Sequence, residues 1–501
     1  MSKKLTLITI LVLLLFLNTL SFSQIVTYEA GILVNPTLDE GVYEYQEYFF
    51  LTGEPILLKG TVEVPDIPND DNYSITYDFE LTNDEQNIEY TRSITYDVVN
   101  KKDNQLSQTT YKATINSIDE TITIDGDNYN LGSYLFDRTK IIDNTPAVDY
   151  YSGNLYFKRI YYLNGDSINN EGKIVHTINS TEDTGYKHHW GESETLILKH
   201  EIDSEITQGE DTIKWSGIID TKNSSVDKKR FKYKHTDPQN ISFRGSFIKS
   251  NTMENVVQIT YSLPSVDGEN IDETKRVADE KNLTKDIIND FDSLIVPKIK
   301  DIGGHWAEDE IFLLRSIKIF ENNNKYFAPD TFMNRIQFGK AIANAISDIQ
   351  KGDLTDQIIN ERDNQEKPFK DIELDDADYE YVKFLKDKGI MNGEYGYFNK
   401  YSAITRQEAV KIMIYALGLE DLAPSPPYQT KFIDDENISK WAKDSIFMAD
   451  QISLVNGYPD GTFRPKKRLS KADAAVLIKG FIDHIKDTIT VDYREKIINK
   501  Y

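Results

Sequence analysis

The stretch Val455–Pro465, with the sequence VNGYPDGTFRP, decides how the C-terminal part of this chain folds. Pro459 fixes its own φ and Gly461 can adopt a positive φ, so the stretch predicts a tight turn. Ser470–Asp473 (SKAD) follows shortly afterwards, and a serine with an acidic residue three positions later is typical of a helix N-terminus. The pattern therefore predicts a turn followed by a helix whose first residue is basic.

The same pattern occurs three times between residues 297 and 485. In each copy an aromatic residue precedes a basic residue by eight positions, in the pairs Phe327 and Arg335, Phe398 and Arg406, and Phe463 and Lys471. An aspartate opens each copy, at Asp301, Asp371 and Asp434. This recurrence predicts three helix–turn–helix repeats, over 297–347, 367–420 and 430–485, with 486–501 as a tail. We expect the first helices to bury Trp306 and Trp441.

The basic residue at each predicted second-helix start is unusual. A cation at a helix N-terminus is disfavoured by the helix dipole by about 0.3 to 1 kcal/mol, so three such placements need a cause. One interpretation is an anion held by free backbone N–H groups together with the basic side chain. The other is a structural salt bridge from each basic residue to a carboxylate of a neighbouring repeat. The residues alone leave both interpretations open.

These motifs resemble those of S-layer homology domains. The resemblance rests on the opening aspartate, His305–Ala307 (HWA), Ile404–Glu408 (ITRQE) and Val455–Pro465, and it covers residues 297–485 as three tandem copies. It implies an all-α pseudo-trimer that holds bacterial surface proteins, without a covalent bond, on a pyruvylated secondary polysaccharide linked to peptidoglycan. The ligand is then expected in grooves between adjacent copies.

The resemblance also implies which residues bind the polymer. Arg335, Arg406 and Lys471 would meet the ketal-pyruvate carboxylate. The other implied contacts are the opening acids, the small residues after the first helices and the tryptophans: Asp301, Asp371, Asp434, Gly393, Gly457, Trp306 and Trp441. Three departures lead us to expect that fewer than three grooves bind: Asn322 replaces a glycine, Ala377 replaces a tryptophan, and Lys471 offers a point charge rather than the fork of an arginine.

The N-terminal region, residues 24–264, has a different pattern. Runs such as Tyr73–Leu81 (YSITYDFEL) and Leu155–Tyr162 (LYFKRIYY) alternate polar and apolar residues with period two and are rich in aromatic and β-branched residues. They predict mainly antiparallel β-structure in one or two domains. The period does not distinguish a sandwich from one curved sheet. The charged stretch 265–296 is interpreted as a linker that ends in a helix.

Composition limits the compartment and the partners. The chain has 501 residues, 57 Lys and Arg against 82 Asp and Glu, and a net charge of −25, which argues against nucleic acid as a partner. Its lack of cysteine excludes disulfides and thiolate metal sites. Residues 1–23 have the charged start, apolar run and small residues of a signal peptide. We therefore predict a secreted, cell-wall protein with no membrane span after cleavage.

No motif for catalysis is found in the β-rich region. The sequence contains no HExxH, GxSxG or phosphate-binding loop, and His188 and His189 would point to opposite faces of a strand. We therefore expect no cofactor, no metal and no enzyme activity. The predicted role of this region is structural or adhesive, in contact with other S-layer subunits. The alternative is a wall- or polysaccharide-acting enzyme that the repeats hold in place.

Overall fold

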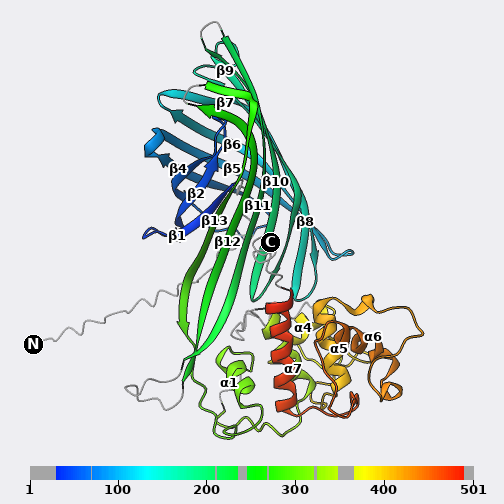
Figure 1. Cartoon of the computed structure of the whole chain (residues 1–501). Coiled ribbons are helices and arrows are strands. Elements are labelled where there is room, and N and C mark those ends of the chain that lie inside the picture. Colours follow the sequence, from blue (N-terminus) through cyan, green and yellow to red (C-terminus); the bar gives the residue numbers. More distant parts are fainter. Residues whose placement is uncertain are drawn as a thin grey trace, which may run out of the picture.

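The computed structural model describes residues 30–68, 70–208, 211–234, 245–267, 270–320, 324–347 and 366–489. They form a tall antiparallel sheet that stands on a compact helical part (Figure 1). The predicted signal peptide and most of the predicted tail lie outside these residues. The fold class is the predicted one, a mainly antiparallel β-region followed by helices.

The sheet contains thirteen strands, and each pairs with the next one along the chain. The strands are β1 (Gly31–Pro36), β2 (Val42–Phe49), β3 (Ile56–Glu63), β4 (Asn72–Asn83), β5 (Ile88–Asp103), β6 (Gln108–Ile124), β7 (Asp127–Asn144), β8 (Val148–Leu163), β9 (Gly172–His188), β10 (Gly191–Gln208), β11 (Asp211–Lys234), β12 (Ser246–Asp267) and β13 (Asn270–Ser293). The sheet curls so far that β1 also lies beside β13. The β-region is thus one curved, nearly closed sheet and not a sandwich.

Aromatic residues fill much of the inner face of this sheet. The ring of Phe136 lies 5.2 Å from that of Tyr96 and 5.3 Å from that of Phe157, and Tyr45 packs against Phe79 at 5.3 Å. All five residues are buried. Residues two apart in a strand share a face, so the alternation of the sequence becomes one continuous apolar core.

The inner face also holds buried charges, which the sequence pattern did not reveal. Arg138 donates from Nε to Asp183 Oδ2 at 2.9 Å and from a terminal nitrogen to Glu194 Oε1 at 2.7 Å. Lys140 Nζ reaches the same Glu194 oxygen at 2.6 Å. Burial opposes the charge on Arg138, but the two carboxylates outweigh it and raise the pKa of the guanidinium. The sheet therefore neutralises its buried cations with its own carboxylates.

The prediction of a linker and helix over 265–296 is wrong. Most of this segment is β13, which pairs with β12 from Ile248↔Ser293 to Asp267↔Asn270. Its described charged side chains are all exposed or half-buried, and a charged strand at the end of a sheet resists pairing with other chains. The high charge that indicated a linker thus belongs to the last strand of the sheet.

Among the residues that the structure describes, the helical part contains three helix pairs. They are α1 (Glu308–Ser316) with α2 (Arg335–Ile346), α4 (Tyr379–Asp387) with α5 (Arg406–Leu417), and α6 (Lys440–Gln451) with α7 (Lys471–Asp483). We call the residues 297–347, 367–420 and 430–485 segments one, two and three. The second helix of each segment begins at the predicted basic residue and carries a capping box. Short bridges, Phe332↔Ser470, Asn334↔Ala403 and Thr405↔Arg468, connect the three segments in a ring.

The sheet and the helical part share one apolar core. Ala147, Val148, Tyr186 and Trp190 of the sheet belong to the same buried cluster as the helices. Trp190, between β9 and β10, donates its indole N–H to the carbonyl of Ala345 at 2.8 Å, in the last turn of α2. The last carbonyls of a helix have no partner within the helix, so the sheet supplies one here.

Candidate ligand-binding grooves

Three grooves lie between the segments, and each contains one of the predicted basic residues. We name them after that residue: the Arg335 groove of about 390 Å³, the Arg406 groove of about 970 Å³ and the Lys471 groove of about 160 Å³. In each groove, one segment contributes the cation and the next segment contributes the end of its first helix and the side of its second. The three basic residues thus face grooves between segments, and their contact with a polymer stays a prediction.

The backbone at each helix start is not available to a ligand. The first two N–H groups of each second helix donate to carbonyls of the adjoining segment at 2.9 to 3.1 Å: Arg335 to Ser402, Ile336 to Lys400, Arg406 to Lys467, Gln407 to Pro465, Lys471 to Thr331 and Ala472 to Pro329. The interpretation of free N–H groups holding an anion is therefore wrong. At the helix starts, the basic side chains are therefore the groups that remain to meet an anion.

Arg335 is held by a carboxylate. Its Nε donates to the carbonyl of Phe398 at 3.0 Å, and one terminal nitrogen donates to Glu408 Oε1, also at 3.0 Å. Glu408 belongs to segment two, so the alternative of a structural salt bridge between repeats holds for this groove. Lys411 and Trp441 complete the wall of the same groove.

Arg406 has a different environment. One terminal nitrogen donates to the carbonyl of Asn456 at 2.7 Å, and the guanidinium lies over the rings of Tyr458 and Phe463 at 5.2 and 5.0 Å. Its Nε is shielded from solvent and has no hydrogen-bond partner among the described residues. Burial lowers the pKa of Arg406, which nearby Tyr458 and Asp473 partly oppose. An arginine with donors left over beside a wide groove is suited to an anionic ligand.

Lys471 resembles Arg406 in having a carbonyl partner. Its Nζ donates to the carbonyl of Phe327 at 3.1 Å. Burial lowers the pKa of Lys471, and the charge of Asp301 opposes this effect. Among the described residues, the Lys471 groove receives no tryptophan from segment two, whereas Trp441 of segment three lines the Arg335 groove and Trp306 of segment one lines the Arg406 groove. Ala377 stands at the corresponding position, and the predicted departure at Asn322 lies outside the described residues.

The three opening aspartates have a structural role. Each carboxylate accepts two backbone N–H groups of its own segment's turn at 2.7 to 2.8 Å: Asp301 from Phe327 and Ala328, Asp371 from Phe398 and Asn399, and Asp434 from Phe463 and Arg464. None of these aspartates is among the described residues that line the three grooves. We therefore revise the expectation that these acids contact the polymer: they shape the turns that precede the cations.

The two predicted glycines line grooves, but the packing of the segment to which each belongs already requires a glycine at that position. Gly393 has φ of +66°, and a Cβ there would lie 2.5 Å from the carbonyl oxygen of Tyr397. A Cβ at Gly457 would lie 3.0 Å from the ring of Phe432. Gly393 faces the Arg335 groove and Gly457 the Arg406 groove. Close packing within each segment is thus a sufficient reason for glycine at both positions.

Both tryptophans are exposed, which contradicts the prediction that the first helices bury them. Trp306 is 64% exposed and precedes α1, and Trp441 is 51% exposed at the start of α6. Trp306 belongs to segment one and lines the Arg406 groove, which lies between segments two and three. Trp441 belongs to segment three and lines the Arg335 groove, which lies between segments one and two. Large exposed rings beside a groove are typical of binding sites, because an amphipathic ring packs against a ligand without being part of the core.

No groove contact was predicted from the sequence for Glu408, Tyr458 or Asp473, which all line grooves. Glu408 pairs with Arg335, Tyr458 packs under Arg406, and Lys467 contacts both carboxylate oxygens of Asp473 at 3.1 and 3.2 Å. Glu408 and Asp473 were recognised only as the last residues of helix-capping motifs. Their position, three residues after the N-cap and two after the cation of their own helix, was the available signal.

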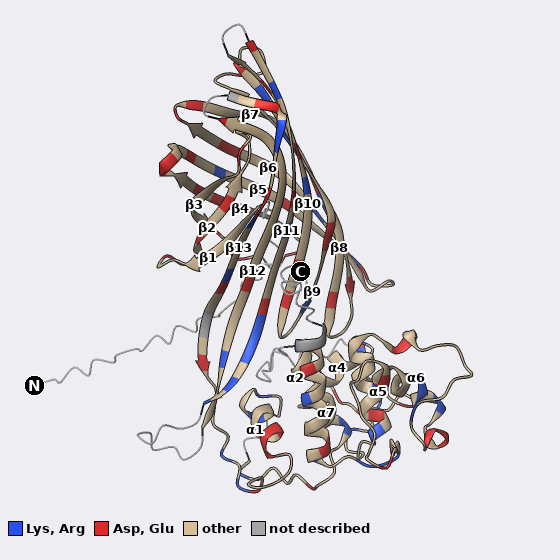
Figure 2. Cartoon of the chain, in the orientation of Figure 1, with Lys and Arg blue, Asp and Glu red and all other residues tan. Residues whose placement is uncertain are grey.

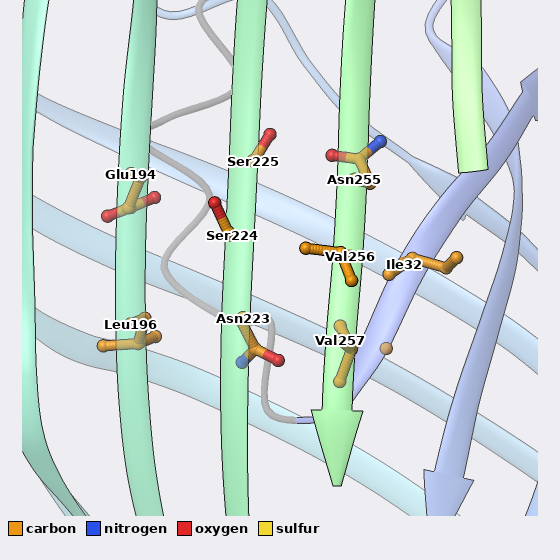
Figure 3. A pocket seen from close by; sticks show the side chains of 10 residues that line it. Ile32, Glu194, Leu196, Asn223, Ser224, Ser225, Asn255, Val256 and Val257 are labelled. Atoms are coloured by element: carbon orange, nitrogen blue, oxygen red, sulfur yellow. The ribbon is translucent and has the colours of Figure 1, made fainter. Parts of the chain in front are cut away.

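The cavities described within the sheet are small. Figure 3 shows one between β10, β11, β12 and β1, lined by Ser224, Asn255 and their neighbours, with a volume of about 20 Å³. A second, near His176 and Glu120, has about 30 Å³. Each has room for about one water molecule. Within the described ranges, no three His, Asp or Glu residues are grouped so as to hold a metal ion, and no helix is long and apolar enough to cross a membrane.

Two stretches of the chain, residues 368–410 and 431–475, match the S-layer homology domain. These stretches lie in segments two and three. The exoglucanase XynX of Acetivibrio thermocellus is 28% identical over 185 residues, which are 36% of this chain and 16% of that protein. A cellulosome-anchoring protein of Acetivibrio thermocellus is 32% identical over 120 residues, 24% of this chain and 26% of its own length.

A surface layer protein of Brevibacillus choshinensis is 29% identical over 106 residues, 21% of this chain and 9% of that protein. The chain therefore spans only a small part of the curated relatives it matches. The relatives that are glycosidases share the S-layer homology region with it, and the matches carry no catalytic evidence to this chain. The domain match and the surface-protein relatives identify the chain as a secreted protein associated with the cell wall.

Proposed function

We propose that segments one, two and three are three S-layer homology copies that attach the chain to the cell wall by binding an anionic, pyruvylated secondary polysaccharide in the grooves between them. Segment one supports the third copy, because it repeats the aspartate clamp, the capping box and the basic first residue of the other two. The observation that carries the proposal is the recurrence of one cation at the same helix position, facing a groove each time.

The sheet then presents itself outward as a structural or adhesive surface, in contact with neighbouring S-layer subunits. Its filled inner face and water-sized cavities favour this role over turnover of a small substrate. Acidic and basic residues are interspersed along the strands and helices of both parts of the molecule (Figure 2).

Co-sedimentation tests the attachment. The chain without residues 1–23 is mixed with walls of a Gram-positive organism that makes pyruvylated polymer, before and after the polymer is stripped. The variant Arg335→Ala, Arg406→Ala, Lys471→Ala is compared with a control that loses three exposed lysines of the sheet, Lys59→Ala, Lys173→Ala, Lys214→Ala. We expect the parent and the control to sediment only with intact walls, and the groove variant to stay in solution. Equal binding to stripped walls, or by the groove variant, would refute the proposal.

A further inference from the structure

Each groove brings together two positions of neighbouring second helices. The first residue of one helix, a cation, faces the third residue of the next helix. These pairs are Arg335 with Glu408, Arg406 with Asp473, and Lys471 with Gln337. The third residue differs in each segment, so the three grooves differ in how far the chain itself neutralises the cation.

Glu408 divides its two carboxylate oxygens between two tasks. Oε2 accepts the backbone N–H of Thr405 at 2.8 Å and so completes the capping box of α5. Oε1 accepts from Arg335 at 3.0 Å. A carboxylate on this guanidinium occupies the place that the carboxylate of an anionic ligand would take.

Asp473 does not do the same for Arg406. It is one methylene shorter, its Oδ2 accepts the backbone N–H of Ser470 at 3.2 Å, and Lys467 contacts both of its oxygens. Among the described residues Arg406 has no carboxylate within ion-pair distance. The carboxylate of Asp473 is thus paired with Lys467, and Arg406 keeps donors for a ligand.

We propose that Glu408 is a specificity-determining residue that acts as an internal substitute for the ligand, so that the Arg406 groove binds the anionic polymer first and the Arg335 groove is blocked by Glu408. This inference rests on the proposed function. The Lys471 groove has no such carboxylate, because Gln337 is neutral, but it is the smallest of the three and receives no tryptophan.

Glu408→Gln tests the proposal, because it introduces the residue that segment one has at the equivalent position. In segment one, Gln337 completes the capping box by accepting the N–H of Asn334 at 3.1 Å. A glutamine at 408 keeps this cap and places an amide, in place of a carboxylate oxygen, beside Arg335. The probe is the anionic polysaccharide released from the walls, titrated into the chain without residues 1–23 by calorimetry, with the same polymer after chemical removal of its pyruvate as the negative control.

We expect Arg406→Ala to weaken binding at least about tenfold, and Arg335→Ala to weaken it several-fold less. Glu408→Gln should tighten binding or add a second equivalent of bound polymer repeat, and adding Arg335→Ala to it should remove the gain. The proposal is overturned if Arg335→Ala costs as much as Arg406→Ala, or if Glu408→Gln folds normally and binds like the parent. If the glutamine variant does not fold, Glu408→Asp, which copies segment three, must give the gain. Failure of the parent itself to bind would instead refute the proposed function.

Discussion

Arg138 in the sheet and Arg406 in the helical part are both removed from much of the solvent, yet they are satisfied in opposite ways. Arg138 has two carboxylate partners within 3.0 Å, whereas Arg406 donates to the carbonyl of Asn456. An arginine that the fold neutralises completely has little left to offer a ligand, and one held by a carbonyl and two rings keeps its charge available. The comparison distinguishes a structural cation from a binding cation.

Removing the structural cation gives the largest expected effect and tests this distinction most directly. Arg138→Ala leaves Asp183 and Glu194 buried with Lys140 alone, and we expect it to lower the free energy of unfolding by about 3 to 5 kcal/mol. Chemical denaturation measures the change. Lys199→Ala is the matched control, because its pair with Glu201 is exposed and should contribute little to stability. Equal effects of the two substitutions would contradict a structural role for Arg138.

The contact between sheet and helices gives the next largest effect. Trp190→Ala removes a buried ring and the indole N–H bonded to Ala345, and we expect a loss of about 3 kcal/mol in thermal unfolding. Trp190→Phe keeps much of the packing without the donor and should cost less. If the alanine variant unfolds like the parent, the two parts are not stabilised through this contact.

Acid should weaken the same contact through His188. Burial, then the nearby His189, Lys229 and Lys486, lowers the pKa of His188 to about 3 in the folded chain. A depressed pKa means that its contribution is complete above pH 6.5 and is lost as the pH falls from 6.5 towards 3. At pH 5 the loss is about 2 kcal/mol relative to pH 7. Comparing pH profiles of the melting temperature for the parent and His188→Gln measures this: the variant should have the shallower slope, and identical slopes would exclude His188 as the cause.

The smallest effect on stability is expected at Arg406. Its alanine variant frees the carbonyl of Asn456, which water can satisfy, and removes the guanidinium from the rings of Tyr458 and Phe463, so the free energy of unfolding should fall by about 1 kcal/mol. Wall binding measured on the same sample should nevertheless be lost. A stability loss as large as that of Arg138→Ala would show that Arg406 is structural and would remove the distinction between the two arginines.

Local signals predicted the helical part well. Capping motifs fixed the starts of the second helices at Arg335, Arg406 and Lys471, because caps depend on residues within one turn. The family match covers two of the three predicted repeats. The exposure of Trp306 and Trp441 was not predictable in the same way, because it depends on which segment each ring faces after the ring of segments closes.

Long-range pairing limited what could be predicted for the sheet. The period of two identified most strands. The prediction was wrong for β13 because charged and apolar residues alternate irregularly there, and it is the hydrogen bonds to β12 that hold this segment in the sheet. The buried cluster around Arg138 joins β7, β9 and β10, and no spacing along the chain indicates that these residues meet. Glu408 was visible as a capping residue, but its second partner comes from another segment.

The seating of Trp190 on the end of α2 has a mechanical consequence. β11 contains 24 residues, and at about 3.3 Å per residue such a strand is about 80 Å long. Because the sheet joins the helices through a shared core, a sideways pull at its far end acts as on a lever, and the torque arrives at the C-terminal end of α2, a helix whose first turns line two grooves. Shear on the outer surface of the cell is thereby transmitted to the attachment point with little slack.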